Sequence, residues 1–257
     1  MNLTLPVSRH ITSDNYFMIA GIWALEYRQP GPILDHQKES LFHSNFGIIQ
    51  QEFLVHFDSI KEFLSNEHIT LFSFDLGPVA EQVVVKDYKY ICKSPPLKYR
   101  ELKTLIAQRL EIIRQNYSGR IAMENLNHYD SSAYDIVCDA SFIDEVVREN
   151  DAYFLLDLSH AAISALNQKS DVFEYLKQLP LDKVIQIHIS GSAYNQEKGI
   201  YFDCHHLPSA MELEMLLFLK DKISTEVYLA LEYYESFEKI KNYYELSLLP
   251  FASRSRT

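Results

Sequence analysis

Glycine is scarce in this sequence, with only seven among 257 residues. No glycine-rich phosphate loop follows any apolar run, which argues against a nucleotide-binding Rossmann fold. The three cysteines, Cys92, Cys138 and Cys204, are too few and too scattered for a disulfide framework or a cysteine-type zinc site. No apolar run approaches the ~18–20 residues that a membrane-spanning helix needs.

Basic residues are also in the minority, because 24 Lys and Arg stand against 35 Asp and Glu, for a net charge of -11. Contacts with nucleic-acid phosphates require clustered Lys and Arg, so this balance argues against a nucleic-acid partner, although a local basic patch would still bind one. The first residues, MNLTLP, do not combine a basic region with an apolar core, so we expect no signal peptide. We therefore expect a cytoplasmic protein without a membrane partner.

Four short apolar runs each end in a residue type that binds metals. They span residues 120–124, 153–157, 184–188 and 227–232, and they end in Glu124, Asp157, His188 and Glu232. Such runs are typical of strands that are buried on both faces of a parallel sheet. Strands that carry ligands at their carboxyl ends indicate a barrel with its site on one rim.

The rest of the chain alternates between strands and helices. Further strands are predicted near residues 3–8, 16–24, 40–45 and 69–76, and helices near 48–63, 100–116, 140–148, 159–166, 172–177, 209–222 and 235–248. Residues 79–96 read as irregular, and 125–140 and 190–209 as long loops. This alternation favours one eight-stranded parallel TIM (β/α)8 barrel domain over residues 1–257, rather than an open doubly wound sheet.

Nine residues at the predicted strand ends and in the long loops are candidate metal ligands. Singly, each reads as a solvated or hydrogen-bonded side chain, but burying many beside apolar strands is costly unless they are paired or bind metal. Imidazole and carboxylate suit zinc, iron or manganese, and shared carboxylates permit several ions. The candidates are His43, Asp75, Glu124, Asp157, His160, His188, Asp203, His205 and Glu232. Cys204 is interpreted as a bystander, and His206 stays ambiguous.

The order of these residues resembles that of the xylose-isomerase-like barrels that include endonuclease IV, in which the matching positions hold three zinc ions. A second group of the same superfamily is similar over more of the chain, roughly residues 40–235. These are the multinuclear non-heme iron-dependent oxidases, which include the methanobactin biosynthesis oxidase. The similar motifs are Pro95-Pro-Leu-Lys-Tyr99, Glu124-Asn125 with Tyr129, Leu155-Leu-Asp157 with Asn167, His188-Ile-Ser-Gly191, Asp203-Cys-His205 and Glu232-Tyr233.

Two positions depart from the oxidase pattern. Asp75, in Ser73-Phe-Asp75-Leu76, stands where the oxidases have a histidine, and His160 stands where they have an asparagine. The resemblance implies an oxidase that uses two or three iron ions and dioxygen to modify a ribosomally made precursor peptide, often at cysteine. It also implies a peptide-binding partner protein, and catalytic roles for Glu124, Asp157 and His160. The alternatives are a zinc-dependent phosphodiesterase or abasic-site endonuclease, and a sugar isomerase.

Overall fold

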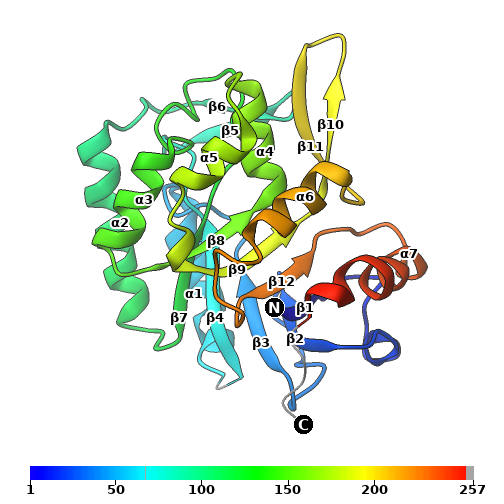
Figure 1. Ribbon diagram of the computed structural model, residues 1–257. Helices are drawn as coiled ribbons and strands as arrows, with labels where there is room; N and C mark the ends of the chain where they lie inside the picture. Colours follow the sequence, from blue (N-terminus) through cyan, green and yellow to red (C-terminus); the bar gives the residue numbers. More distant parts are fainter. Residues whose placement is uncertain (67, 253–257) are drawn as a thin grey trace.

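The structure is a computed structural model that describes residues 1–66 and 68–252 (Figure 1). Its centre is a closed barrel in which every pair of neighbouring strands is parallel. In barrel order the strands are β1 (Asn2–Pro6), β12 (Tyr228–Leu231), β9 (Val184–Ile189), β8 (Tyr153–Asp157), β7 (Arg120–Glu124), β4 (Ile69–Asp75), β3 (Glu39–His43) and β2 (Ile22–Tyr27). The predicted eight-stranded parallel barrel is confirmed.

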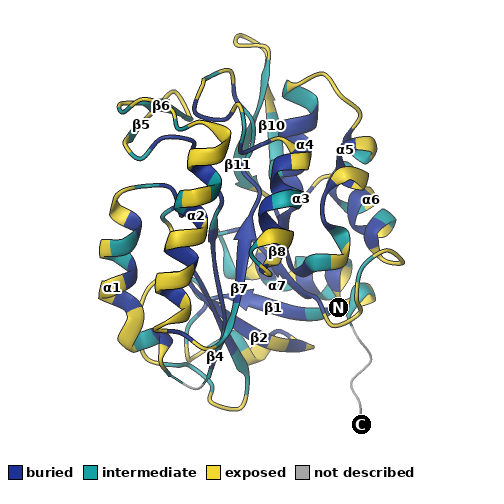
Figure 2. Cartoon of the chain, turned by 90° about the vertical axis from the view of Figure 1, so that its left-hand side faces the viewer, coloured by how far each residue is buried: buried dark blue, intermediate teal, exposed yellow. Residues whose placement is uncertain are grey.

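Helices surround the barrel, and most of them bury the face that packs on it and expose the other, as the dark inner and yellow outer surfaces in Figure 2 show. They are α1 (Glu52–Leu64), α2 (Tyr99–Arg114), α3 (Ala140–Glu149), α4 (Leu158–Asn167), α5 (Val172–Gln178), α6 (Ala210–Leu219) and α7 (Phe237–Tyr243). The helix predicted over 235–248 is interrupted, because a π-helical segment (Tyr244–Leu248) follows α7. Short 3-10 turns lie at Tyr16–Met18, Leu181–Lys183 and Leu249–Phe251.

Every second residue of each strand points into the barrel interior. Residues alternate between the two faces of a strand, so positions two apart lie on the same face. An apolar cluster therefore fills the barrel, formed by Ala24, Leu41, Leu71, Ala122, Leu155, Ile185 and Tyr228. Two residues further along five of these strands come Glu26, His43, Ser73, Glu124 and Asp157, all buried. The carboxyl end of the barrel thus carries a polar layer directly above an apolar one.

The predicted loop 190–209 is wrong in part, because it contains an antiparallel hairpin of β10 (Gly191–Asn195) and β11 (Ile200–His206). Its turn is stabilised by Asn195, whose side-chain oxygen accepts a hydrogen bond from the Lys198 amide at 3.0 Å. Gly199 supplies the positive φ of 65° that closes the turn. The hairpin projects from the barrel at the top of Figure 1.

The irregular segment predicted over 79–96 also contains a hairpin, formed by β5 (Val83–Lys86) and β6 (Lys89–Cys92). Both residues of its two-residue turn have positive φ, 52° for Asp87 and 70° for Tyr88. Such turns normally carry Asn-Gly or Asp-Gly, so Asp-Tyr gives no recognisable signal. The two hairpins meet, because the Tyr88 and Phe202 rings lie 5.3 Å apart and Lys198 pairs with Asp87 at 3.4 Å.

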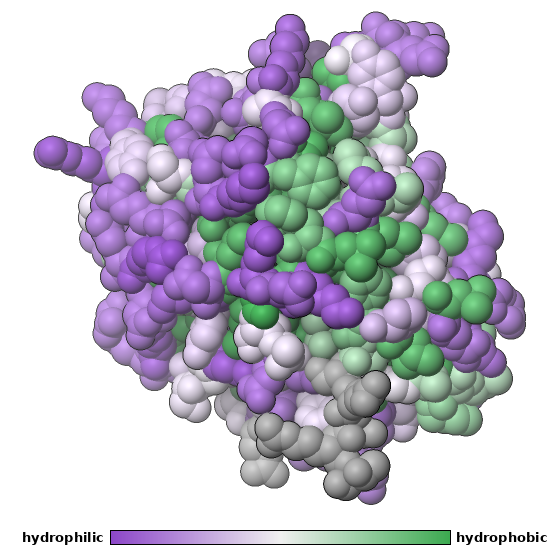
Figure 3. All heavy atoms as spheres, in the orientation of Figure 1, coloured by the Kyte–Doolittle hydropathy of each residue, from purple (hydrophilic) through white to green (hydrophobic). Residues whose placement is uncertain are grey.

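The outer surface of the barrel is mixed in character. Figure 3 shows apolar side chains in the middle of one face with hydrophilic side chains around them. On α6, the side chain of Leu217 is 57% exposed. Among the described residues, no helix combines the length and apolar character needed to cross a bilayer.

Candidate metal centre

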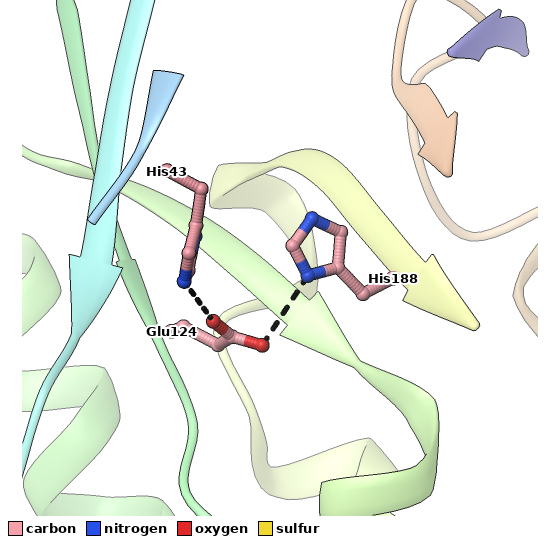
Figure 4. A group of neighbouring side chains, drawn as sticks. All are labelled: His43, Glu124 and His188. Atoms are coloured by element: carbon pink, nitrogen blue, oxygen red, sulfur yellow. Dashed lines mark ion pairs between the residues drawn. The ribbon is translucent and has the colours of Figure 1, made fainter. Parts of the chain in front are cut away.

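The carboxylate of Glu124, at the end of β7, lies at the centre of the polar layer (Figure 4). One of its oxygens, Oε2, is 3.2 Å from Nε2 of His43. The other, Oε1, is 3.4 Å from Nδ1 of His188 and 3.7 Å from Nδ1 of His160. Both carboxylate oxygens of Glu124 therefore face histidine side chains, and these histidines come from three other elements.

The structure brings most of the nine candidates into groups with metal-ligand spacing. Among the described residues, three groups have ligand atoms within 4.8 Å of one another: His43, Glu124 and His188; Glu124, Asp157 and His160; and Glu26, His188 and Glu232. Asp203 and His205 adjoin them, since His205 lies 3.1 Å from Asp203 and 3.2 Å from Glu232. Asp75 is outside these groups but pairs in register with Glu124 on the neighbouring strand.

Asp157 joins β8 to α4 and serves as the N-cap of that helix. Its Oδ1 accepts a hydrogen bond from the amide of His160 at 2.7 Å, which explains the Asp-x-x-His spacing. Asn125 holds the main chain of Asp157 from the other side, donating to its carbonyl at 3.0 Å and accepting from its amide at 2.9 Å. The remaining oxygen, Oδ2, is buried and has no hydrogen-bond partner among the residues that the structure describes.

Two of the histidines have one ring nitrogen engaged and the other directed toward a carboxylate. His160 Nδ1 lies 2.9 Å from the carbonyl of Asn125, which only accepts, so Nδ1 carries the proton. Its Nε2 then faces Asp203 at 3.7 Å. His43 Nδ1 contacts Ser73 Oγ at 3.0 Å, and its Nε2 faces Glu124. Burial and the charge of Arg28 lower the pKa of His43 to about 3, which keeps the ring neutral, as metal binding requires.

The carboxyl groups of the polar layer crowd one another. Burial and the neighbouring Glu124 raise the pKa of Asp75 to about 8. Burial is also the main cause that raises the pKa of Asp157 to about 6. Burial acts in the same direction on Glu124, yet the neighbouring imidazoles of His43, His188 and His160 hold its pKa well below the usual range. A bound cation would relieve this crowding by stabilising all three carboxylates in their charged forms.

Sequence reasoning missed Glu26 and Arg28. The strand predicted over 16–24 lies instead at Ile22–Tyr27, after a 3-10 turn that ends before Gly21, which has a φ of 75°. Glu26 therefore points into the barrel two residues beyond Ala24, and it is fully buried. Residues 22–26 also form an apolar run that ends in Glu, the same signal that identified Glu124.

Motif residues outside the groups attach the β10–β11 hairpin to the barrel. The Tyr129 hydroxyl accepts a hydrogen bond from the Asp203 amide at 3.1 Å. The Asn167 side chain pairs with both main-chain groups of Tyr201, at 2.8 and 3.0 Å. His205 then reaches the site from a left-handed backbone conformation, with a φ of 48°, which is uncommon for residues other than glycine.

The remaining members of the Asp-Cys-His-His segment lie apart from the groups. Cys204 directs its thiol to the carbonyl of Gly191 at 3.2 Å, and His206 is exposed. The interpretation of Cys204 as a bystander stays a prediction. The site opens on the hairpin side, where the His205 side chain is 40% exposed, whereas those of His43 and Glu124 are 3% exposed.

These residues fit one or more metal ions. Among the described residues, two buried polar atoms of the site, Oδ2 of Asp157 and Nδ1 of His188, have no hydrogen-bond partner, which is costly unless something else occupies them. Neutral imidazole and carboxylate oxygen are the donors that zinc, iron and manganese accept. Because Glu124 belongs to two of the three groups, its carboxylate is placed to be shared between two ions.

A family model described as "RiPP precursor modification enzyme MbnB/TglH/ChrH" matches residues 56–243. The chain belongs to this family. Among curated proteins it resembles UPF0276 proteins, at 30% identity over 120 residues in Acaryochloris marina and 33% over 121 residues in Vibrio parahaemolyticus. These matches cover 46% of this chain in both cases, and 43% and 42% of the relatives. The chain thus spans less than half the length of these relatives.

Solved structures of low sequence identity share the fold over nearly the whole chain. A xylose isomerase domain protein from Planctomyces limnophilus superposes with a TM-score of 0.62 at 12% identity, covering 97% of this chain and 95% of that one. The 3-keto-D-glucoside 4-epimerase from E. coli gives a TM-score of 0.59 at 12% identity, with 98% of each chain covered. The chain therefore shares the barrel fold of these proteins.

Proposed function

We propose that this protein is a multinuclear non-heme iron-dependent oxidase that uses dioxygen to modify a ribosomally made precursor peptide, with cysteine as the target. Membership of the RiPP precursor-modification family supports the peptide substrate. The observation that carries the proposal is the position of Glu124, whose two oxygens face His43 on one side and His188 and His160 on the other. A carboxylate shared in this way is suited to a centre with more than one ion.

The proposed ligands are the nine residues named from the sequence: His43, Asp75, Glu124, Asp157, His160, His188, Asp203, His205 and Glu232. Iron held by nitrogen and oxygen donors with an open position exchanges electrons with dioxygen, which supplies the oxidising power that peptide modification needs. Glu124, Asp157 and His160 form the proposed catalytic group. Asn125 fixes both Asp157 and His160, because it hydrogen-bonds the main chain of one and the ring of the other.

The peptide is proposed to approach beside the β10–β11 hairpin, where the site is most open. Tyr194 is 52% exposed there, and its ring lies 4.8 Å from that of Tyr201. The net charge of -11 favours a basic leader segment over a polyanion. A peptide-binding partner protein is proposed to deliver the precursor, so the assay needs arms with and without one.

The test begins with protein purified without added metal. Iron in excess of one ion per chain, with Mössbauer signals, supports the proposal, and oxygen uptake is then measured with a peptide encoded beside the gene. Glu124→Gln is expected to lose both the iron signal and oxygen uptake, whereas the surface variant Asp58→Asn (side chain 70% exposed) keeps them. The zinc-loaded protein is expected to leave abasic duplex DNA uncut. Stoichiometric zinc with metal-dependent nicking of that duplex, lost in Glu124→Gln, would overturn the oxidase in favour of a nuclease.

A further inference from the structure

Glu26 belongs to a group with metal-ligand spacing, yet its own oxygens are already surrounded by hydrogen-bond donors. Its Oε1 lies 3.3 Å from Nε of Arg28. Its Oε2 accepts a hydrogen bond from the side-chain amide of Gln186 and lies 2.8 Å from Nε2 of His188. Glu26, Gln186 and His188 are all fully buried. This carboxylate therefore differs from that of Asp157, one oxygen of which is buried with no hydrogen-bond partner in the described part of the chain.

The His188 ring is divided between two environments. Nε2 faces Glu26, whereas Nδ1 lies 3.4 Å from Glu124 and 3.2 Å from Glu232 and has no hydrogen-bond partner within residues 1–66 and 68–252. A neutral imidazole binds a metal through its bare nitrogen and carries a proton on the other. The hydrogen bond made by one ring nitrogen therefore decides which of the two nitrogens is unprotonated and available to a metal.

The proton belongs on Nε2. Gln186 Nε2 lies 2.9 Å from this ring nitrogen and would donate to it if it were bare. In that arrangement, however, a lone pair of His188 would face a carboxylate oxygen at 2.8 Å with no proton between them. With the proton on Nε2, His188 and Gln186 both donate to Oε2 of Glu26, and Nδ1 is left unprotonated. A metal ion on Nδ1 would separate its lone pair from the carboxylates of Glu124 and Glu232, which lie 3.4 and 3.2 Å away.

We propose that Glu26 is a positioning residue, which holds the proton on Nε2 of His188 and thereby makes Nδ1 the metal-binding nitrogen, without binding an ion itself. This inference rests on the proposed metal centre. Carboxylates that fix ligating histidines in this way commonly lie just outside metal centres. Arg28 strengthens the assignment, because its guanidinium contacts both Glu26 and Glu232 and disfavours a second cation between them.

The test uses the zinc-loaded protein, which is diamagnetic, with histidines labelled with nitrogen-15. We expect NMR to place the proton of His188 on Nε2 and zinc on Nδ1, and anomalous scattering at the zinc edge to place the ion on the side of Glu124 and Glu232. Glu26→Gln keeps the side-chain volume but removes the charge. It is expected to bind the same number of ions about 10- to 100-fold more weakly, with a mixture of the two His188 tautomers. The matched ligand variant Glu232→Gln is expected to lose an ion while His188 keeps its proton on Nε2.

Three results would contradict the assignment of Glu26 while leaving the metal centre in place. They are zinc on Nε2 with a Glu26 oxygen as ligand, the loss of an ion in Glu26→Gln, and unchanged affinity with an unchanged tautomer in that variant. The wild-type measurements decide the first of these even if the variant does not fold. A wild-type protein that binds neither zinc nor iron would instead refute the proposed metal centre, and the inference with it.

Discussion

Asp75→Asn tests the electrostatics of the metal-free site. Burial and Glu124 raise the pKa of Asp75 from 3.8 to about 8 in the folded protein. Because the folded pKa is the higher one, the folded state binds this proton more tightly than the unfolded state. The resulting stabilisation is fully present below about pH 4 and is lost as the pH rises through about 8. Metal-free wild type should therefore lose stability relative to Asp75→Asn, which cannot ionise, between pH 5 and 9.

The size of the effect follows from the shift. A difference of about four pKa units corresponds to at most about 6 kcal/mol, and the measured difference is smaller because Asp75 and Glu124 titrate together. Urea denaturation of both metal-free proteins at pH 5, 7 and 9 measures it. His188 and Asp157, whose pKa values are also raised, shift stability in the same direction, so the difference between the two proteins isolates Asp75. Equal pH slopes in wild type and variant would refute the reasoning, and exposed Asp58→Asn is the control.

Four further variants test the site. His188→Ala and Glu232→Ala are each expected to lose metal, measured by elemental analysis, and to stay folded by circular dichroism; unchanged metal content in both would contradict their assignment. Asp75→Ala is expected to keep at least two ions, because the other eight proposed ligands remain; an empty site would make that carboxylate central. Asn167→Ala removes two hydrogen bonds to Tyr201, at about 1 kcal/mol each, and should speed hydrogen exchange in β11 but not in β7.

The sequence predicted the barrel well because buried parallel strands leave a strong local pattern. The runs that end in Glu124, Asp157 and His188 are β7, β8 and most of β9, with their ligands where the chain leaves the barrel. The predicted strand 40–45 differs from β3 by only one or two residues at each end. These runs are short and nearly continuously apolar, and this combination is typical of buried strands and not of helices.

The misses have a different physical origin. The turn of β5–β6 depends on positive φ at Asp87 and Tyr88. Neither residue is a glycine, so the sequence carries no recognisable turn signal there. Glu26 was missed because the apolar residues before it belong partly to a 3-10 turn. The predicted strand therefore began and ended too early and did not include Glu26 among its inward-facing residues. The hydrogen bonds of Asn167 and Tyr129 depend on where β11 lies, which only tertiary structure fixes.

The polar layer explains why a departure such as Asp75 is compatible with the site. Asp75 lies opposite Glu124 in the strand register, so replacing a histidine by a carboxylate adds negative charge beside a shared carboxylate. Without an ion, Asp75 responds by keeping its proton, as its pKa of about 8 indicates. A bound ion would displace this proton, because the charged carboxylate would stabilise a neighbouring cation. Metal binding at this site should therefore release protons and strengthen as the pH rises toward 8, and the folded state gains stability whenever the ion is present.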